Sequence, residues 1–149
     1  MLSVYRLLIR ILVINPVTTG RLDRITQEYL EKVASPNTTV VVRSVREGPR
    51  TIESVYDREL ASRYVVEEVV RAEKEGFDAA IINCFDDPGL HASRERVHMP
   101  VYGIGETSIT VALLLGHRIA IISTGRNSRA LYHRRALEMG IIHRVAYAG

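Results

Sequence analysis

Residues 79–90, AAIINCFDDPGL, show the pattern that decides the fold. A short run of small and β-branched apolar residues, 79–83, is followed at once by a polar turn that leads into a helical stretch. Five similar apolar runs recur along the chain, with longer helical stretches between them: 8–14, 39–45, 101–104, 118–123 and 144–148. This alternation is typical of βα units, so we predict an α/β fold with parallel sheets flanked by helices.

The longest helix is predicted at residues 57–75. The helical period places four apolar side chains on one face and five charged side chains outside it. The apolar set is Leu60, Tyr64, Val65 and Val69, and the charged set is Glu67, Glu68, Arg71, Lys74 and Glu75. Gly76 follows directly and is predicted to end the helix.

Met99-Pro100 is the predicted joint between two α/β domains, because a residue before proline is pushed out of the helical conformation. We therefore divide the chain into an N-terminal α/β domain, residues 1–98, and the start of a second one, residues 99–149. The second domain has three predicted strands and its last strand is followed by no covering helix. Since parallel sheets are covered on both faces, we expect this domain to be incomplete.

The composition excludes several classes of protein. The chain has 149 residues, 46% apolar and 25% charged, so it is expected to be globular with a real core. Cys84 is the only cysteine, which excludes an intramolecular disulfide and a cysteine zinc cluster and favours a reducing, cytoplasmic setting. The histidines lack the spacing of metal ligands, so no metal site is expected.

The same composition bears on partners. The apolar run near the N-terminus is interrupted by Arg10 and is too short to cross a bilayer, so no membrane role is expected. The net charge is +3, and residues 100–149 hold six arginines against two acidic residues. No basic stripe interleaved with aromatic residues is present, and we expect no nucleic-acid partner.

Polar residues stand just after the predicted strands, where parallel α/β sheets bind their ligands. Six of them are of types that cap helices: Thr18, Thr19, Thr107, Ser108, Asn127 and Ser128. One interpretation is that each caps its own helix. The other is that several helix N-termini converge and offer N–H groups and hydroxyls to a carboxylate or an imide-like ligand.

Cys84 also has two interpretations. It is either a small buried apolar side chain or a thiol at a helix N-terminus, where the pKa of a thiol is lowered and the thiolate serves as base or nucleophile. Asp86 and Asp87 oppose that lowering by adding negative charge. The arginines near residues 126–135, including Arg134 and Arg135, are predicted to form a solvated face. The alternative for Arg126, which stands at the start of the predicted helix, is contact with an anionic group of a substrate.

Three strand-end segments, taken together, match a known family. They are residues 14–19, INPVTT, residues 83–90, NCFDDPGL, and residues 100–106, PVYGIGE. The chain resembles the hydantoin racemase branch of the aspartate/glutamate racemase superfamily, and Gly48-Pro49 followed by Ile52-Glu53-Ser54 also fits that branch. The resemblance covers nearly the whole chain, and the cysteine run with its Asp-Pro-Gly turn is its most specific part.

This resemblance implies a two-domain enzyme that racemises its substrate without a metal or any other cofactor. Two cysteines act on opposite faces of the substrate carbon in that family, and Cys84 matches the first of them. Five residues are then expected to bind substrate: Asn15, Thr18, Thr19, Phe85 and Thr124. Val17 stands where the family commonly has a second Asn, and Asp86 where it commonly has Gly, which bears on substrate preference.

The second cysteine of the family lies beyond the last predicted strand, so the chain is expected to be truncated at its C-terminus. The leading hypothesis is a cofactor-independent racemase of hydantoins or related amino-acid derivatives that holds one of the two cysteines. The alternatives are an inactive α/β domain that only binds a small molecule, and a half-site subunit that needs a partner. A homo-oligomer is expected, because the final strand is left uncovered.

Overall fold

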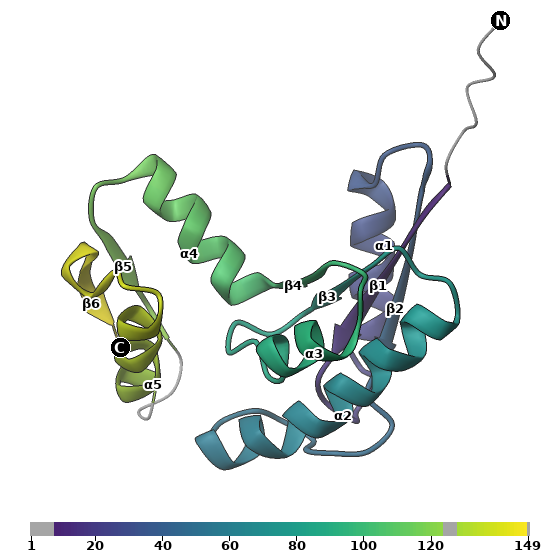
Figure 1. Cartoon of the computed structure of the whole chain (residues 1–149), viewed down its shortest axis with the longest axis horizontal. Helices are drawn as coiled ribbons and strands as arrows, with labels where there is room; N and C mark the ends of the chain where they lie inside the picture. The colour runs from purple at the N-terminus through teal and green to yellow at the C-terminus, as the bar shows by residue number, and fades with distance from the viewer. Residues whose placement is uncertain (1–7, 124–127, 149) are drawn as a thin grey trace, which may run out of the picture.

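The computed structural model describes residues 8–123 and 128–148, and within them the fold is α/β (Figure 1). The elements follow in this order: β1 (Ile9–Asn15), α1 (Asp23–Val33), β2 (Thr38–Ser44), α2 (Val55–Lys74), β3 (Ala79–Ile82), α3 (Leu90–Arg96), β4 (Val101–Gly103), α4 (Ile104–Leu115), β5 (Ile119–Ile121), α5 (Ser128–Glu138), a 3-10 turn (Ile142–Arg144) and β6 (Val145–Ala148). All six predicted strands are confirmed, with shifts of one to two residues at their ends.

The first sheet has four parallel strands in the order β2-β1-β3-β4. Strand β4 comes after the predicted joint at Met99-Pro100, yet it pairs with β3, with Ala80 opposite Val101. The first sheet therefore extends to Gly103, because β4 comes back beside the open edge of β3 once α3 has crossed over. A division of the chain into domains 1–98 and 99–149 stays a prediction.

Strand β1 lies in the middle of the core. Its last four residues, Leu12 to Asn15, are all buried, as expected for a central parallel strand that is covered on both faces. Val65 and Val69 of α2 and Ile82 of β3 belong to the same core. The carboxyl ends of three strands are thereby held close together at one edge of the sheet.

Helix α2 begins at an N-cap, Ser54, whose Oγ accepts a hydrogen bond from the Asp57 amide at 3.2 Å. Gly76 has a φ of +78° just after the helix, which confirms the predicted stop. The prediction for Glu68 is wrong: the residue is 3% exposed and its carboxylate lies 2.7 Å from Arg71. Leu60 is exposed, so the buried face is rotated from the predicted one.

The second unit consists of β5, α5 and β6, and helix α4 leads into it from the first sheet (Figure 1). Strands β5 and β6 form a separate parallel pair. A small second core contains Ile109, Ile121 and Tyr132. Within residues 8–123 and 128–148, none of the helices has the length and apolar character needed to span a bilayer.

Candidate active site at the strand ends

A chain of side-chain hydrogen bonds joins the carboxyl ends of β1, β2 and β3. The Asn83 amide donates to Asn15 Oδ1 at 2.7 Å, and the Asn15 amide donates to Asp23 Oδ1 at 2.7 Å. The hydroxyl and the backbone N–H of Ser44 both donate to the Asp23 carboxylate, at 2.7 and 3.0 Å. Asn15 is 2% exposed, so the network is buried and fixes the ends of the strands. We call these four residues, Asn15, Asp23, Ser44 and Asn83, the floor of the site.

The residues expected to hold substrate occupy different places around this floor. Thr18 is half-buried, and its N–H and hydroxyl donate to the Pro49 carbonyl at 3.0 and 3.4 Å, which joins the loop after β1 to the loop after β2. Thr19 is half-buried in the same loop. Thr124 lies outside the described residues. A contact of Asn15, Thr18 or Thr19 with a substrate stays a prediction.

The interpretation as helix caps is wrong for Thr18, Thr19, Thr107 and Ser108. Helix α1 begins at Asp23 with Leu22 at its N-cap, beyond Thr18 and Thr19. Helix α4 begins at Ile104, directly after β4, so Thr107 and Ser108 lie inside it, and the Ser108 hydroxyl donates to the Ile104 carbonyl. Asn127 lies outside the described residues, and Ser128 is the first residue of α5.

Cys84 lies in a tight turn two residues after β3. The Asp87 amide donates to the Cys84 carbonyl at 3.0 Å, which closes the turn. Asp87 has a φ of +45°, and among the residues that the structure describes it is the only one other than glycine in the left-handed region. The thiol is half-buried, and the turn fixes its position relative to the Asn83–Asn15 pair.

The ionisation of Cys84 differs from the prediction. The pKa of the Cys84 thiol is raised to about 11, chiefly by burial and also by the carboxylates of Asp86 and Asp87, whereas the Asp86 backbone and the Arg135 guanidinium act in the lowering direction. Of the two interpretations of Cys84, the one with a lowered thiol pKa is therefore wrong. The physical reason is that α3 begins only at Leu90, so a helix N-terminus does not compensate for burial and two nearby carboxylates.

Asp87 caps α4 from a distant part of the chain. Its carboxylate accepts hydrogen bonds from the N–H groups of Gly105 at 2.9 Å and Glu106 at 2.7 Å, in the first turn of that helix. Arg135 of α5 lies 3.2 Å from the same carboxylate. Burial raises the pKa of Asp87, although these three partners all favour its charged form. One buried side chain thus connects the cysteine turn to α4 and α5.

Asp87→Ala is expected to lower the free energy of unfolding by about 3 kcal/mol, because it removes the cap of α4 and leaves the buried Arg135 without its carboxylate. Urea denaturation followed by circular dichroism measures this. Asp87→Asn retains one acceptor oxygen and serves as the matched control, with an expected loss smaller than that of the alanine variant. A loss below about 1 kcal/mol for Asp87→Ala would show that the cap contributes little.

Phe85 packs toward the second unit. Its ring meets the Tyr132 ring edge to face, with centroids 5.4 Å apart and an interplanar angle of 90°. It also lines a cavity of about 240 Å³ together with Ile109 and Ile121. The ring therefore anchors the cysteine turn in the second core, and its expected contact with substrate stays a prediction.

Arg135 is the site residue that sequence reasoning missed. The solvated face predicted around residues 126–135 is wrong for it, since its side chain is 11% exposed and donates to the Phe85 carbonyl. The helical period carries the signal: Tyr132 and Ala136 are buried, and Arg135 lies between them on the same face. Arg126 lies outside the described residues.

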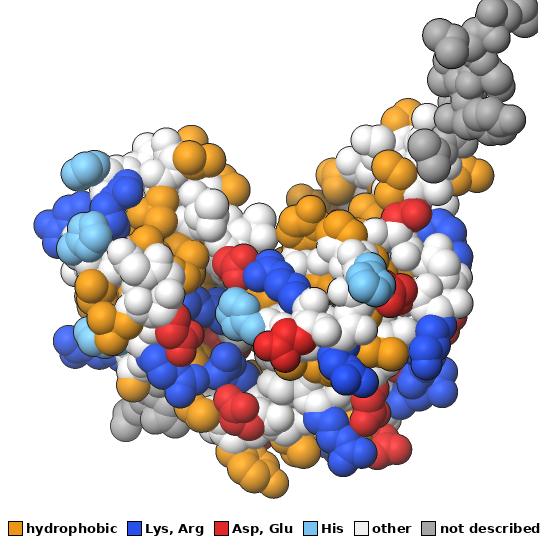
Figure 2. Space-filling model, viewed as in Figure 1, with side chains coloured by type: hydrophobic (Ala, Val, Ile, Leu, Met, Phe, Trp, Pro, Cys, Tyr) orange, Lys and Arg blue, Asp and Glu red, His pale blue; other side chains and the backbone are white. Residues whose placement is uncertain are grey.

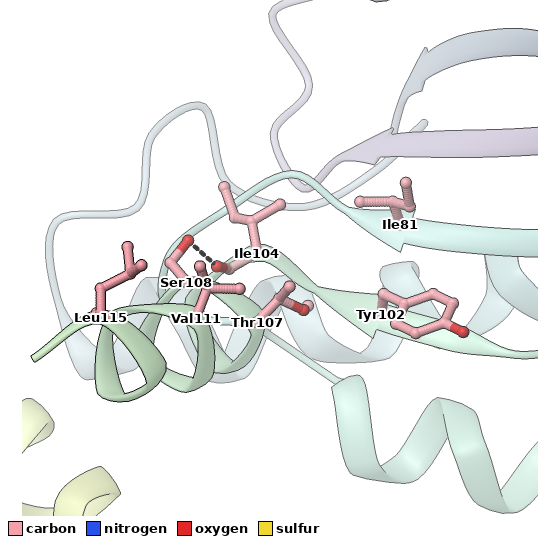
Figure 3. Close-up of a pocket in the computed structure, with 9 residues that line it drawn as sticks. Ile81, Tyr102, Ile104, Thr107, Ser108, Val111 and Leu115 are labelled. Atoms are coloured by element: carbon pink, nitrogen blue, oxygen red, sulfur yellow. Dashed lines mark hydrogen bonds between the residues drawn. The ribbon is translucent and has the colours of Figure 1, made fainter. Parts of the chain in front are cut away.

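A larger groove runs along α4 and the edge strand β4. Its volume is about 610 Å³ and its walls are mainly apolar. Figure 3 shows Ile81 and Tyr102 of the sheet on one side and Ile104, Val111 and Leu115 of α4 on the other. Figure 2 shows the molecule hollowed between its two parts, with hydrophobic side chains along the hollow. The groove is not lined by Cys84, and its lining holds no carboxylate, imidazole, thiol or amine.

Within the described ranges, no three His, Cys, Asp or Glu side chains are grouped so as to hold a metal ion. The chemistry available at the strand ends is that of one thiol. The groups around it are two carboxylates, one guanidinium and several backbone amides.

A family model described as Asp/Glu/Hydantoin racemase matches residues 11–149. A hydantoin racemase of Pseudomonas sp. (strain NS671) is 40% identical over 114 residues, which are 76% of this chain and 46% of that protein. A hydantoin racemase of Paenarthrobacter aurescens is 34% identical over 138 residues, 92% of this chain and 58% of that protein. The chain spans about half the length of the curated relatives it matches.

Two solved racemase structures also superimpose on this chain. An allantoin racemase from Klebsiella pneumoniae superimposes with a TM-score of 0.87 at 30% identity, over 94% of this chain and 57% of that one. A glutamate racemase from Campylobacter jejuni superimposes with a TM-score of 0.59 at 20% identity, over 94% of this chain and 56% of that one, and shows a shared fold alone.

Proposed function

The chain belongs to the Asp/Glu/hydantoin racemase family, and on this premise we propose that it acts on a hydantoin or a related amino-acid derivative by proton transfer at the chiral carbon. The observation that carries the proposal is the position of its single cysteine. Cys84 lies at the carboxyl end of β3, in a turn tied by hydrogen bonds to the ends of β1 and α4.

In the proposed step, the Cys84 thiolate removes the proton from the carbon next to the substrate carbonyl and becomes a thiol. The electron pair moves into the carbonyl, and the thiol then returns a proton to the same carbon. The thiol exchanges its proton with the solvent and then protonates the carbon on the face that it deprotonated, so solvent hydrogen is incorporated without inversion. Inversion requires a second acid on the opposite face, and Cys84 is the chain's only cysteine.

The chiral centre of a hydantoin suits this site because its proton is acidified by the adjacent ring carbonyl. The ring also carries N–H and C=O groups that hydroxyls and amides bind. We propose that Asn15, Thr18, Thr19 and Phe85 hold it, with Thr124 as a further contact. The support is that the first four flank the turn or its hydrogen-bonded floor.

We also propose that the reaction needs no metal and no other cofactor, since the thiol supplies the base. The lone cysteine supports a reducing, cytoplasmic setting. Self-association is supported by Leu114 and Leu115 of α4, which are 82% and 85% exposed. We propose a small molecule as the only ligand class, with neither nucleic acid nor a membrane as partner.

The test incubates the purified chain in deuterated water with a single enantiomer of a 5-substituted hydantoin and follows exchange of the hydrogen at the chiral carbon. Proton NMR measures deuterium at the chiral carbon, and polarimetry measures inversion. We expect deuterium incorporation with the optical rotation retained. Because the pKa of Cys84 is about 11, about one thiol in a thousand is ionised at pH 8, and the rate is expected to rise about tenfold per pH unit toward pH 11.

Racemisation in this assay would contradict the one-thiol step and would show that a second acid is supplied. Absence of any exchange above the protein-free rate would contradict catalysis. A second candidate function is a domain that binds the small molecule without reacting with it. The raised pKa of the only thiol favours this candidate, because little thiolate is present near neutral pH. Binding heat in a calorimeter together with no exchange identifies that case.

A further inference from the structure

Arg135 crosses from α5 to the turn that carries Cys84. Its Nη1 donates to the Phe85 carbonyl and lies 3.2 Å from Asp87 Oδ2. Its guanidinium carbon is 5.9 Å from the centroid of the Phe85 ring. The guanidinium thus contacts the first and the third residue after Cys84, and it does so from the second unit.

The packing around the guanidinium leaves it little freedom. The Asp87 side chain is 3% exposed, so this ion pair is desolvated, unlike a surface pair. A Cβ on Gly105 would overlap Arg135 Nη1 and the Phe85 carbonyl, which shows that the guanidinium fits directly against the first turn of α4. A buried charge held in this way acts on its neighbours with little screening by water.

The charges that face the cysteine turn come from the turn itself and from α5, α2 and α4. Asp86 and Asp87 of the turn itself place negative charge beside the thiol, and Arg135 of α5 places positive charge there. Arg58 of α2 donates to the Asp86 carbonyl at 3.3 Å, and Glu106 of α4 adds negative charge near Asp87. Arg135 is therefore the cation whose charge offsets the two carboxylates at the sulfur.

We infer that Arg135 is a positioning residue for Cys84. It holds the Phe85–Asp87 backbone that orients the thiol, and its positive charge makes formation of the thiolate depend on the docking of α5. A role of Arg135 in catalysis rests on the proposed function, but the effect of Arg135 on the Cys84 thiol is measurable without any substrate.

The experiment measures the rate of Cys84 alkylation by iodoacetamide as a function of pH, since only the thiolate reacts. Arg135→Met is expected to slow alkylation at pH 9 about tenfold, which corresponds to a rise of about one unit in the thiol pKa. Arg135→Lys keeps the charge and loses the planar fork, so it is expected to recover part of the wild-type rate. Asp87→Asn removes a negative charge and is expected to accelerate alkylation.

The matched control is Arg134→Met. Arg134 is the neighbouring arginine of α5, its side chain is 53% exposed, and it pairs with Glu138 at 3.5 Å. Its removal is expected to leave the alkylation rate unchanged. Equal rates for Arg134→Met and Arg135→Met would overturn the inference.

Loss of folding gives a different result from loss of the charge. If Arg135→Met brings alkylation up to the rate of the urea-denatured chain, Arg135 is a structural tether alone and the inference is overturned. Equal slowing by Arg135→Lys and Arg135→Met would overturn the part assigned to charge. If the chain fails to exchange hydantoin protons while the alkylation rates shift as expected, the proposed function fails and this inference stands.

Discussion

Cys84→Ala is expected to abolish deuterium incorporation into a hydantoin, with a rate about a thousandfold or more below that of the unchanged chain. Cys84 is the only cysteine of the sequence, so a second thiol does not take over. The side chain contributes one sulfur to a turn held by backbone hydrogen bonds, so its truncation leaves the fold in place. Proton NMR in deuterated water gives the rate, and circular dichroism verifies folding.

Cys84→Ser separates geometry from acidity. Serine retains the shape of the side chain, but its hydroxyl is far less acidic than a thiol, so this variant is expected to be as inactive as the alanine variant. Thr110→Ala is a suitable control, because Thr110 is exposed on α4 and its hydroxyl donates to the Glu106 carbonyl of the same helix. Exchange retained by Cys84→Ala would place the base elsewhere and would contradict the proposed role of the thiol.

The fold was largely predictable because its signals are local. Each strand is a short apolar run bounded by polar or turn residues, and these runs are visible in the sequence without any tertiary information. Glu68 shows where this fails. Its charge predicts an outer position, but Arg71 pairs with it one turn along α2 and allows the carboxylate to be buried.

The position of the candidate site was also predictable, since Asn15 ends β1 and Cys84 lies two residues after the neighbouring parallel strand β3. The hydrogen bonds that join the parts of the site were not predictable, because they connect residues far apart in the sequence. Asn83 and Asn15 are 68 residues apart, and Arg135 and Phe85 are 50 apart. Helix α4 begins without a loop after β4, so its cap comes from Asp87, 18 residues before Gly105. Helix-capping rules consider neighbours in sequence and therefore point to Thr107.

Gly105→Ala is expected to destabilise the protein by at least about 4 kcal/mol. Alanine in place of glycine within a helix ordinarily stabilises by up to about 1 kcal/mol, so the sign of the effect is reversed here. The reason is that α4 starts against the cysteine turn. A Cβ on Gly105 would overlap the Phe85 carbonyl and Arg135 Nη1 and would lie 2.9 Å from Asp87 Oδ2.

Gly116→Ala provides the comparison, because Gly116 at the other end of α4 has extended backbone and a Cβ there would lie 3.4 Å from the Arg118 carbonyl, an ordinary contact. Its effect on the free energy of unfolding is expected to stay within about 1 kcal/mol. Arg135→Met is not expected to rescue Gly105→Ala, since the Phe85 carbonyl belongs to the backbone and stays in the way. Urea denaturation of the three variants decides the question: equal stability of Gly105→Ala and Gly116→Ala would mean that α4 and the cysteine turn do not approach this closely, and Asp87 would then lose its role as the cap of α4.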